Sequence, residues 1–151
     1  MSVRVGSPVA GRAVALAAVP DPVFSQAMVG PGVAVEPVRS KSDVVSPLDG
    51  TVVTLHPHAF VVANGEGAAV LVHLGIDTVK RKGEGFELHV VKGEQVQAGQ
   101  KIVTWDPAEV EAAGFAPICP VIALDASADA LGDLAQDVDV AANDALFDWS
   151  R

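Results

Sequence analysis

The feature that most limits the fold of this chain is a series of short, valine-rich apolar segments that turn-forming residues interrupt every few positions. The clearest of these segments are residues 13–19, 32–35, 43–45, 51–55, 60–63, 70–74, 86–90 and 101–105. Short runs that are rich in β-branched residues are typical of strands, whereas helices need longer stretches with a 3.6-residue period. The spacing therefore predicts an all-β fold, in the form of an antiparallel β-sandwich or barrel.

The residues between these segments favour tight turns. Gly, Pro, Asn and Asp cluster at residues 46–50 and 64–67, and the whole chain contains 14 Gly and 10 Pro. Helical signals are weak and predict only short helical turns, one from Asp21 to Met28 and one over residues 107–113. From residue 125 onward we expect acidic surface turns that end in a strand at residues 146–149.

Length and cysteine content indicate one ordinary intracellular domain. The 151 residues can bury a core without disulfides, and we expect a flexible segment over residues 1–12 followed by one domain over residues 13–151. The single cysteine, Cys119, cannot form an internal disulfide, so we interpret it as a small core residue in a reducing compartment. Residues 13–19 are too short for a secretion signal, and we expect a cytoplasmic protein.

The net charge of −9 excludes one class of partner. Proteins that bind nucleic acids need clustered Lys and Arg to neutralise phosphates, and this chain lacks such clusters. An acidic protein instead attracts basic protein partners.

The pairing of two strands decides which histidines meet. The chain has four histidines, namely His56, His58, His73 and His89. If residues 60–63 and 70–74 form a hairpin with a four-residue loop, paired residue numbers sum to 131 and His58 lies opposite His73. A two-residue Asn64-Gly65 turn would instead place His56 opposite His73. In either register His73 gains a histidine neighbour.

Paired imidazoles suit nucleophilic chemistry on phosphorus. An unperturbed imidazole is largely neutral at pH 7, so its free nitrogen can attack without a separate base. Repulsion between neighbouring rings disfavours double protonation, and the second ring can donate a hydrogen bond to developing negative charge. We assign the nucleophile to His73 and the donor to His58. Asp77 either orients a histidine ring or favours release of the phosphoryl group by electrostatic repulsion. Alternatively, it is a solvated carboxylate in a turn.

Three other readings compete on the residue pattern alone. A histidine within an apolar run, such as His73, is more often a hydrogen-bonded core residue than a catalyst. His56 and His58 with His73 also have spacing suited to a zinc hydrolase. Residues 50–53 and 92–101 are similar to parts of biotinyl and lipoyl carrier domains, but the swinging lysine of those domains has no counterpart here. His89 has no identifiable partner, and we give it no role.

Several motifs taken together resemble the glucose-type enzyme IIA family of the phosphoenolpyruvate-dependent sugar phosphotransferase system. The motifs are PDPVFS (residues 20–25), SPLDGT (46–51), HAF (58–60), LVHLGIDTVK (71–80) and KGEGF (82–86). The resemblance implies an antiparallel β-sandwich of the duplicated hybrid motif type and selects the register that pairs His58 with His73. It also implies that His73 is the phosphorylated residue, as a tele-phosphohistidine, and that His58 stabilises the phosphoryl group.

The resemblance also implies the partners. The donor would be the histidine-containing phosphocarrier protein and the acceptor a cysteine of a permease IIB domain, with no cofactor; regulatory proteins are further expected partners. We expect an exposed partner surface made of Val23, Phe24, Met28, Val29, Leu55, Gly75, Ile76 and Asp77. His56-Pro57 departs from the longer Thr-containing turn of some members, so a relay through that Thr is not expected.

Two further expectations follow from the same reading. No segment reaches the roughly 20 apolar residues that span a bilayer, so we expect a free-standing IIA protein. Besides phosphoryl transfer, a purely regulatory module of the same fold stays open, as does incidental zinc at His58 and His73.

Overall fold

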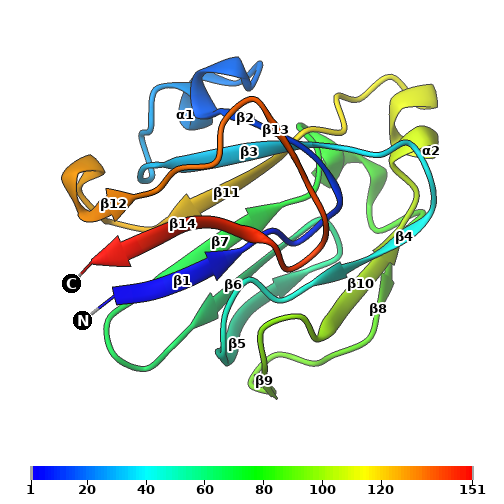
Figure 1. The fold of residues 1–151 in the computed structure, drawn as a ribbon. Coiled ribbons are helices and arrows are strands. Elements are labelled where there is room, and N and C mark those ends of the chain that lie inside the picture. Colours follow the sequence, from blue (N-terminus) through cyan, green and yellow to red (C-terminus); the bar gives the residue numbers. More distant parts are fainter. Residues whose placement is uncertain (1, 151) are drawn as a thin grey trace.

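The structure, a computed structural model that describes residues 2–150, has an all-β fold with short helical turns (Figure 1). Its strand pairs are antiparallel throughout the described residues. The predicted fold class is therefore confirmed. The strands are short because Gly, Pro, Asn and Asp interrupt nearly every apolar run, as the sequence indicated.

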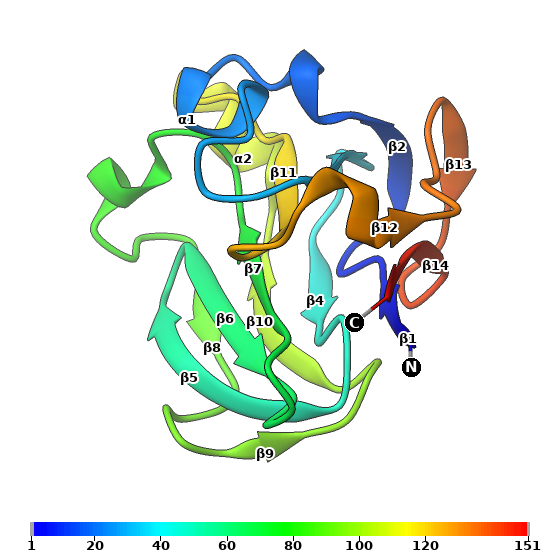
Figure 2. The same cartoon turned by 90° about the vertical axis from the view of Figure 1, so that its left-hand side faces the viewer.

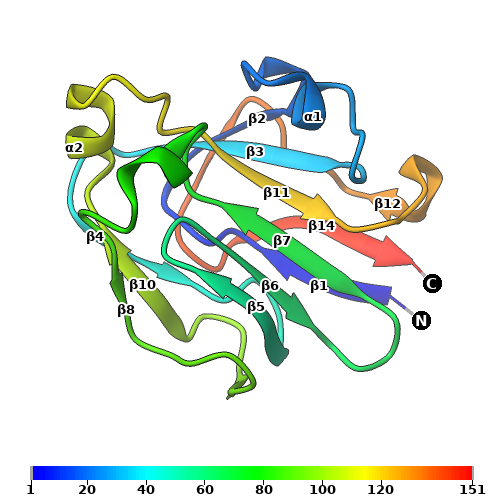
Figure 3. The same cartoon turned by 180° about the vertical axis from the view of Figure 1, so that it is seen from behind.

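The largest sheet contains eight strands. In spatial order they are β13 (Val138–Val140), β2 (Gly11–Ala15), β3 (Gly32–Pro37), β11 (Cys119–Ala123), β7 (Ala69–His73), β6 (Ala59–Ala63), β5 (Gly50–His56) and β9 (Gln95–Val96). Figure 3 looks onto this sheet, with β11, β7, β6 and β5 side by side.

Two three-stranded sheets pack with the large one. The first has the order β1 (Ser2–Gly6), β14 (Ala145–Ser150), β12 (Leu131–Gly132), and the second β4 (Ser42–Val45), β10 (Lys101–Trp105), β8 (Glu87–Leu88). The helical elements are α1 (Pro22–Ser25), α2 (Pro107–Ala112) and the 3-10 turns η1 (Leu16–Ala18), η2 (Thr78–Arg81) and η3 (Ala128–Ala130). Both α-helices lie at one end of the molecule (Figure 2).

The structure differs from the sequence expectation at the N-terminus. The segment expected to be flexible contributes β1, which pairs with β14, and Val5 and Val9 are buried. The cause is the alternation of Val3 and Val5, which presents one face of β1 to the interior. Met1 lies outside the described residues.

The strand β11 was missed by the sequence analysis, although it lies between β3 and β7 in the large sheet. All five of its residues are buried, so it shows no polar alternation, and Pro120 within the run is unusual for a strand. Cys119 is a buried free cysteine at its start, which confirms its interpretation as a core residue. Two predicted strands are also shorter than expected: residues 16–18 form η1, and β8 covers only Glu87–Leu88.

Buried apolar residues form two clusters. The main core lies on the inner faces of the sheets and includes Phe60, Val62, Val70, Val72 and Trp105. A smaller second core lies on the opposite face of the large sheet, beneath α1 and the segment that follows β7. It consists of Leu16, Val19, Phe24, Ala34, Ile76, Ile118 and Ile122. This second core supports the histidines described next.

Candidate functional site

The hairpin of β6 and β7 has a register that neither sequence alternative predicted. Ala59 pairs with His73 and Ala63 with Ala69, so paired residue numbers sum to 132. The cause is a three-residue loop: the amide of Asn64 donates to the carbonyl of Ala68, and the Asn64 side chain accepts from Ala68 and from Glu66. Both sequence registers, which place His58 or His56 opposite His73, are therefore wrong.

His58 nevertheless lies beside His73, because it occupies the tip of the neighbouring hairpin. His56 pairs with Ala59, so Pro57 and His58 are the two central residues of the turn between β5 and β6. The carbonyl of His58 accepts a 2.7 Å hydrogen bond from the amide of Leu74, directly after β7. The rings of His58 and His73 meet edge to face, with 5.3 Å between centroids. The predicted proximity of the two rings is confirmed, but a turn rather than a strand pair produces it.

The ring of His73 is fixed by the backbone of the segment that follows it. Its Nδ1 lies 2.5 Å from the carbonyl oxygen of Gly75. A carbonyl oxygen only accepts, so Nδ1 carries the proton and Nε2 keeps the lone pair. Gly75 has φ of +81°, and a Cβ at that position would lie 2.7 Å from Cγ2 of Thr78. Glycine at position 75 thus allows the backbone to bring its carbonyl to the imidazole.

Hydrogen bonds hold this segment against the sheet. The Thr78 hydroxyl donates to the carbonyl of Leu74 at 2.7 Å, and the amide of Ile76 donates to the carbonyl of Ala116 at 2.9 Å. Thr78 is fully buried and Ile76 nearly so. The Gly75 carbonyl is therefore held in place from both sides, and with it the orientation of the His73 ring.

The short helix α1 supplies a second contact to His73. It begins as the sequence predicted, with the Asp21 side chain accepting from the amide of Val23 and with Pro22 at the first helical position. The helix places Phe24 against His73, with ring centroids 5.2 Å apart and planes inclined by 54°. α1 therefore limits the movement of the imidazole through packing.

Both site histidines favour the neutral form. The pKa of His58 is lowered to about 4, first by burial and then by the positive charges of His73 and His56. Burial also lowers the pKa of His73, while its hydrogen bond to Gly75 and the carboxylates of Asp21 and Asp77 act in the opposite direction. At neutral pH the pair thus offers a neutral nucleophilic nitrogen on His73.

The expected partner surface is only partly exposed. Val23, Met28 and Asp77 are exposed, while Val29 and Leu55 are half-buried. The expectation is wrong for the other three members, which are buried: Phe24, Gly75 and Ile76.

The buried members support the site from below. Phe24 and Ile76 belong to the second core, where burial of their apolar side chains stabilises the fold. Val79 on η2, which the sequence analysis did not include, has a side chain that is 58% exposed, two residues after Asp77. Its only signal was an apolar residue between charged ones, which is too common to identify a surface.

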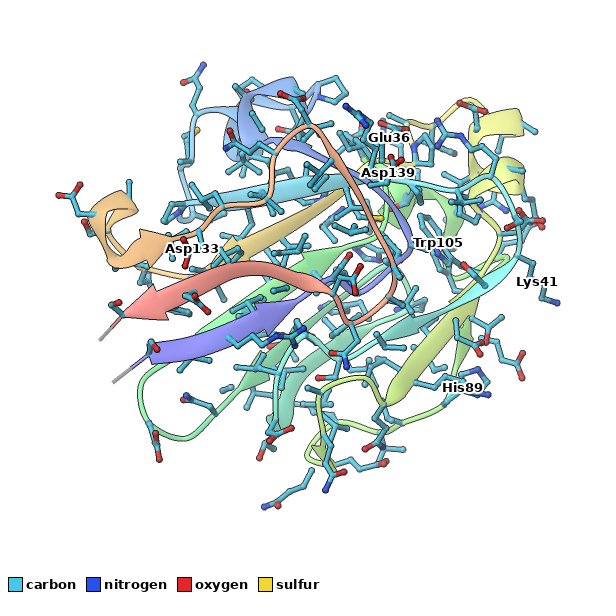
Figure 4. The ribbon with its side chains drawn as sticks, in the orientation of Figure 1. Glu36, Lys41, His89, Trp105, Asp133 and Asp139 are labelled. Atoms are coloured by element: carbon cyan, nitrogen blue, oxygen red, sulfur yellow. The ribbon has the colours of Figure 1, made fainter. Side chains whose placement is uncertain are left out.

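The third and fourth histidines have different surroundings. His56 is exposed, and its ring stacks on that of His58 with 5.7 Å between centroids and 25° between planes. His89 lies beside β8, far from α1 (Figure 4). Its Nε2 is 2.6 Å from the hydroxyl of Thr104, which donates to Asp43. The sequence reading that left His89 without a partner is therefore wrong.

Within residues 2–150, no group of three His, Cys, Asp or Glu side chains is placed to hold a metal ion. The histidines thus lack the ligand set that the zinc hydrolase reading requires, and nothing in the fold favours that reading. Over the same residues, none of the helices has the length and apolar content to cross a bilayer.

Comparisons with known proteins give one consistent family. Residues 3–128 match the family model of the phosphoenolpyruvate-dependent sugar phosphotransferase system, EIIA 1. The chain is 42% identical over 122 residues to the PTS system glucose-specific EIIA component of Oceanobacillus iheyensis, a match that covers 80% of the chain and 73% of that relative.

A fused relative and a solved structure extend this result. The chain is 39% identical over 127 residues to the PTS system glucose-specific EIIBCA component of Corynebacterium glutamicum, with 83% of the chain but only 18% of that longer protein covered. The glucose permease IIA from Mycoplasma capricolum superposes with a TM-score of 0.88 at 30% identity, over 98% of the chain and 96% of that structure.

Proposed function

Because the chain belongs to the EIIA 1 family of the phosphoenolpyruvate-dependent sugar phosphotransferase system, we propose that it is a phosphocarrier in sugar uptake. His73 accepts a phosphoryl group from the phosphorylated histidine-containing carrier protein. It then passes that group to a cysteine of a sugar-specific IIB domain. The proposed carrier acts in the cytoplasm, as one domain.

One observation carries this proposal: the hydrogen bond from Nδ1 of His73 to the Gly75 carbonyl. It leaves the lone pair on Nε2, the nitrogen that attacks phosphorus. The new P–N bond forms at Nε2 while the P–N bond of the donor breaks, and the electron pair returns to the donor imidazole. The product is a phosphohistidine at the tele position, and no cofactor takes part.

His58 has the supporting role. Its ring meets that of His73 edge to face, and its lowered pKa keeps it neutral, so one nitrogen can donate a hydrogen bond to the phosphoryl oxygens. Two positive charges this close together would repel each other, so simultaneous protonation of His58 and His73 is disfavoured. At least one ring of the pair therefore stays neutral. Catalysis is then mainly a matter of position and charge.

The partner proteins meet a shallow surface around the histidines. Val23, Met28 and Val79 are exposed apolar side chains on α1, the loop after it and η2. Exposed apolar residues beside a reactive group suit a surface that must bind two different proteins in turn. Asp21 and Asp77 lend this surface a negative charge that attracts basic groups of a partner.

The direct test is to incubate the protein with phosphoenolpyruvate, enzyme I and the histidine-containing carrier protein and to measure its intact mass. We expect one acid-labile, base-stable phosphoryl group on the wild type and on a His89→Gln control. His73→Gln should carry none. His58→Gln should still be phosphorylated but should transfer the group to the IIB cysteine more slowly. A wild type without the adduct would refute the carrier function.

A further inference from the structure

A third imidazole adjoins the pair of histidines. The three rings form a chain, with 5.7 Å between the centroids of His56 and His58 and 5.3 Å between those of His58 and His73. The contact between His56 and His58 is nearly parallel stacking, at 25°. His56 is the solvent-exposed ring of the three.

The backbone of the turn holds this stack in place. His56 is the last residue of β5 and pairs with Ala59, so the two stacked rings flank Pro57 in a tight turn. Proline fixes its own φ and restricts the residue before it, which is His56. Gly83 lies so close that a Cβ there would come within 3.3 Å of Cγ of Pro57. The turn therefore has little freedom to separate the two imidazoles.

The phosphoryl group changes the electrostatics of this chain of rings. It brings nearly two negative charges to Nε2 of His73, where Asp21 and Asp77 already contribute negative charge. His58 resists protonation because it is partly buried between two other imidazoles. An exposed ring stacked on His58 has no such burial and is the most accessible place for a compensating proton. The remaining charged residues beside Gly83, on the loop that packs against Pro57, are Lys82 and Glu84.

We propose that His56 binds a proton when His73 is phosphorylated. The positive charge of this imidazolium, whose ring stacks on His58, then offsets part of the negative charge of the phosphoryl group. The inference rests on the proposed function. The transfer itself forms the P–N bond on His73 and breaks that of the donor, and the additional proton comes from solvent. His56 is thus a positioning residue that acts through His58 and does not form a bond to phosphorus.

The proposal fixes the sign of a pH effect. If phosphorylation strengthens proton binding at His56, protonated His56 must equally favour the phosphorylated protein. The advantage is present at low pH, where His56 is protonated, and is lost as pH rises through the titration of the phosphorylated form. His56 and His73 are linked by two ring contacts of 5.7 and 5.3 Å. At that range and in partly aqueous surroundings, the attraction of two negative charges for one positive charge corresponds to a displacement of about one pH unit.

The experiment follows the imidazole Cε1–H signals by NMR during pH titration, with and without continuous phosphorylation by phosphoenolpyruvate, enzyme I and the carrier protein. We expect the titration midpoint of His56 to rise by about one pH unit in the phosphorylated protein, while that of His89 stays unchanged. A midpoint of His56 that does not move on a protein that is phosphorylated would overturn the inference and leave the carrier function intact. Absence of the phosphoryl adduct would refute both.

A pair of variants separates charge from stacking. His56→Phe keeps a flat ring on His58 but cannot bind a proton, and His89→Phe serves as the matched control. The equilibrium constant for phosphoryl transfer from the phosphorylated carrier protein to wild type, relative to that for His56→Phe, should rise about five- to tenfold from pH 9 to pH 6. A ratio that is constant over this range would show that His56 contributes only packing and would contradict the proposal.

Discussion

The two hydrophobic cores of this protein differ in how they are built and in what they support. The main core is made by alternate residues of paired strands, as in the hairpin of β6 and β7, where Phe60, Val62, Val70 and Val72 all face inward. The second core collects residues from helical turns, from the segment after β7 and from the far faces of β3 and β11. His73 stands on this second side.

The two cores have different roles: one mainly stabilises the fold, and the other mainly positions the His73 ring. In paired strands, many backbone hydrogen bonds fix the register, and alternate side chains then point to the same face. The main core, which is built in this way, therefore determines the fold. The second core is smaller, and it holds in place α1 and the Gly75 carbonyl, which contact the His73 ring in addition to His58. Damage to the first should reduce stability, whereas damage to the second should reduce phosphoryl transfer.

The largest stability effect is expected in the main core. Phe60 is 1% exposed, and truncation to alanine removes most of a buried ring and leaves a cavity. We expect Phe60→Ala to lower the free energy of unfolding by about 3–5 kcal/mol, measured by urea denaturation. If the folded variant is phosphorylated at a rate close to that of the wild type, the division of roles stands. A loss below about 1 kcal/mol would contradict the assignment of Phe60 to the main core.

The matched change in the second core should act on the site. Phe24 is 7% exposed on the four-residue helix α1, which can settle into the space left by its ring. We expect Phe24→Ala to cost about 1.5–3 kcal/mol, less than Phe60→Ala, because partial collapse fills the cavity. Its rate of phosphorylation should nevertheless fall roughly tenfold, because the ring of His73 is less well positioned. Stopped-flow or quenched-flow measurement gives the phosphorylation rate, with Phe60→Ala as control. If Phe60→Ala were phosphorylated more slowly than Phe24→Ala, the division of roles between the two cores would be contradicted.

A smaller effect should appear in the pH dependence of stability. In the unfolded chain His58 binds a proton near pH 6.5, whereas in the folded protein its pKa is about 4, mainly through burial. The unfolded state therefore takes up the proton first, and stability falls as pH decreases from 6.5 toward 4. Since solvent screens a ring that is only partly buried, we expect wild type to lose roughly 1 kcal/mol more than His58→Gln between pH 7 and pH 4.5.

Denaturation of both proteins at the two pH values measures this difference. Equal losses would mean that His58 titrates in the folded protein as it does in the unfolded chain. That result would contradict the lowered pKa of His58 in the folded protein.

The sequence predicted much of this fold, because most strands carry a signal of their own. Valine-rich runs between turn residues were sufficient for β4, β5, β6, β7 and β10, and the short helix predicted over residues 107–113 is α2. β11 was missed because a strand buried on both faces shows no alternation, and Pro120 argues against a strand. β1 was missed because its partner β14 lies at the other end of the chain.

The proximity of the two candidate site histidines was predicted from the sequence, but the geometry that produces it was not. The motifs around His58 and His73 identified both rings, and the structure places them together. The register was wrong by one, since loop length at residues 65–67 depends on the bonds that the Asn64 side chain makes. The contact of Nδ1 with Gly75 was also beyond sequence reasoning, because it depends on a backbone conformation at φ of +81°.

The most direct test of the central claim is the position of the phosphoryl group on the ring of His73. Nitrogen-15 and phosphorus-31 NMR of the freshly phosphorylated, isotope-labelled protein distinguishes attachment at Nε2 from attachment at Nδ1. The hydrogen bond to the Gly75 carbonyl predicts attachment at Nε2 of His73. Attachment at Nδ1, or on His58 or His56, would contradict the account.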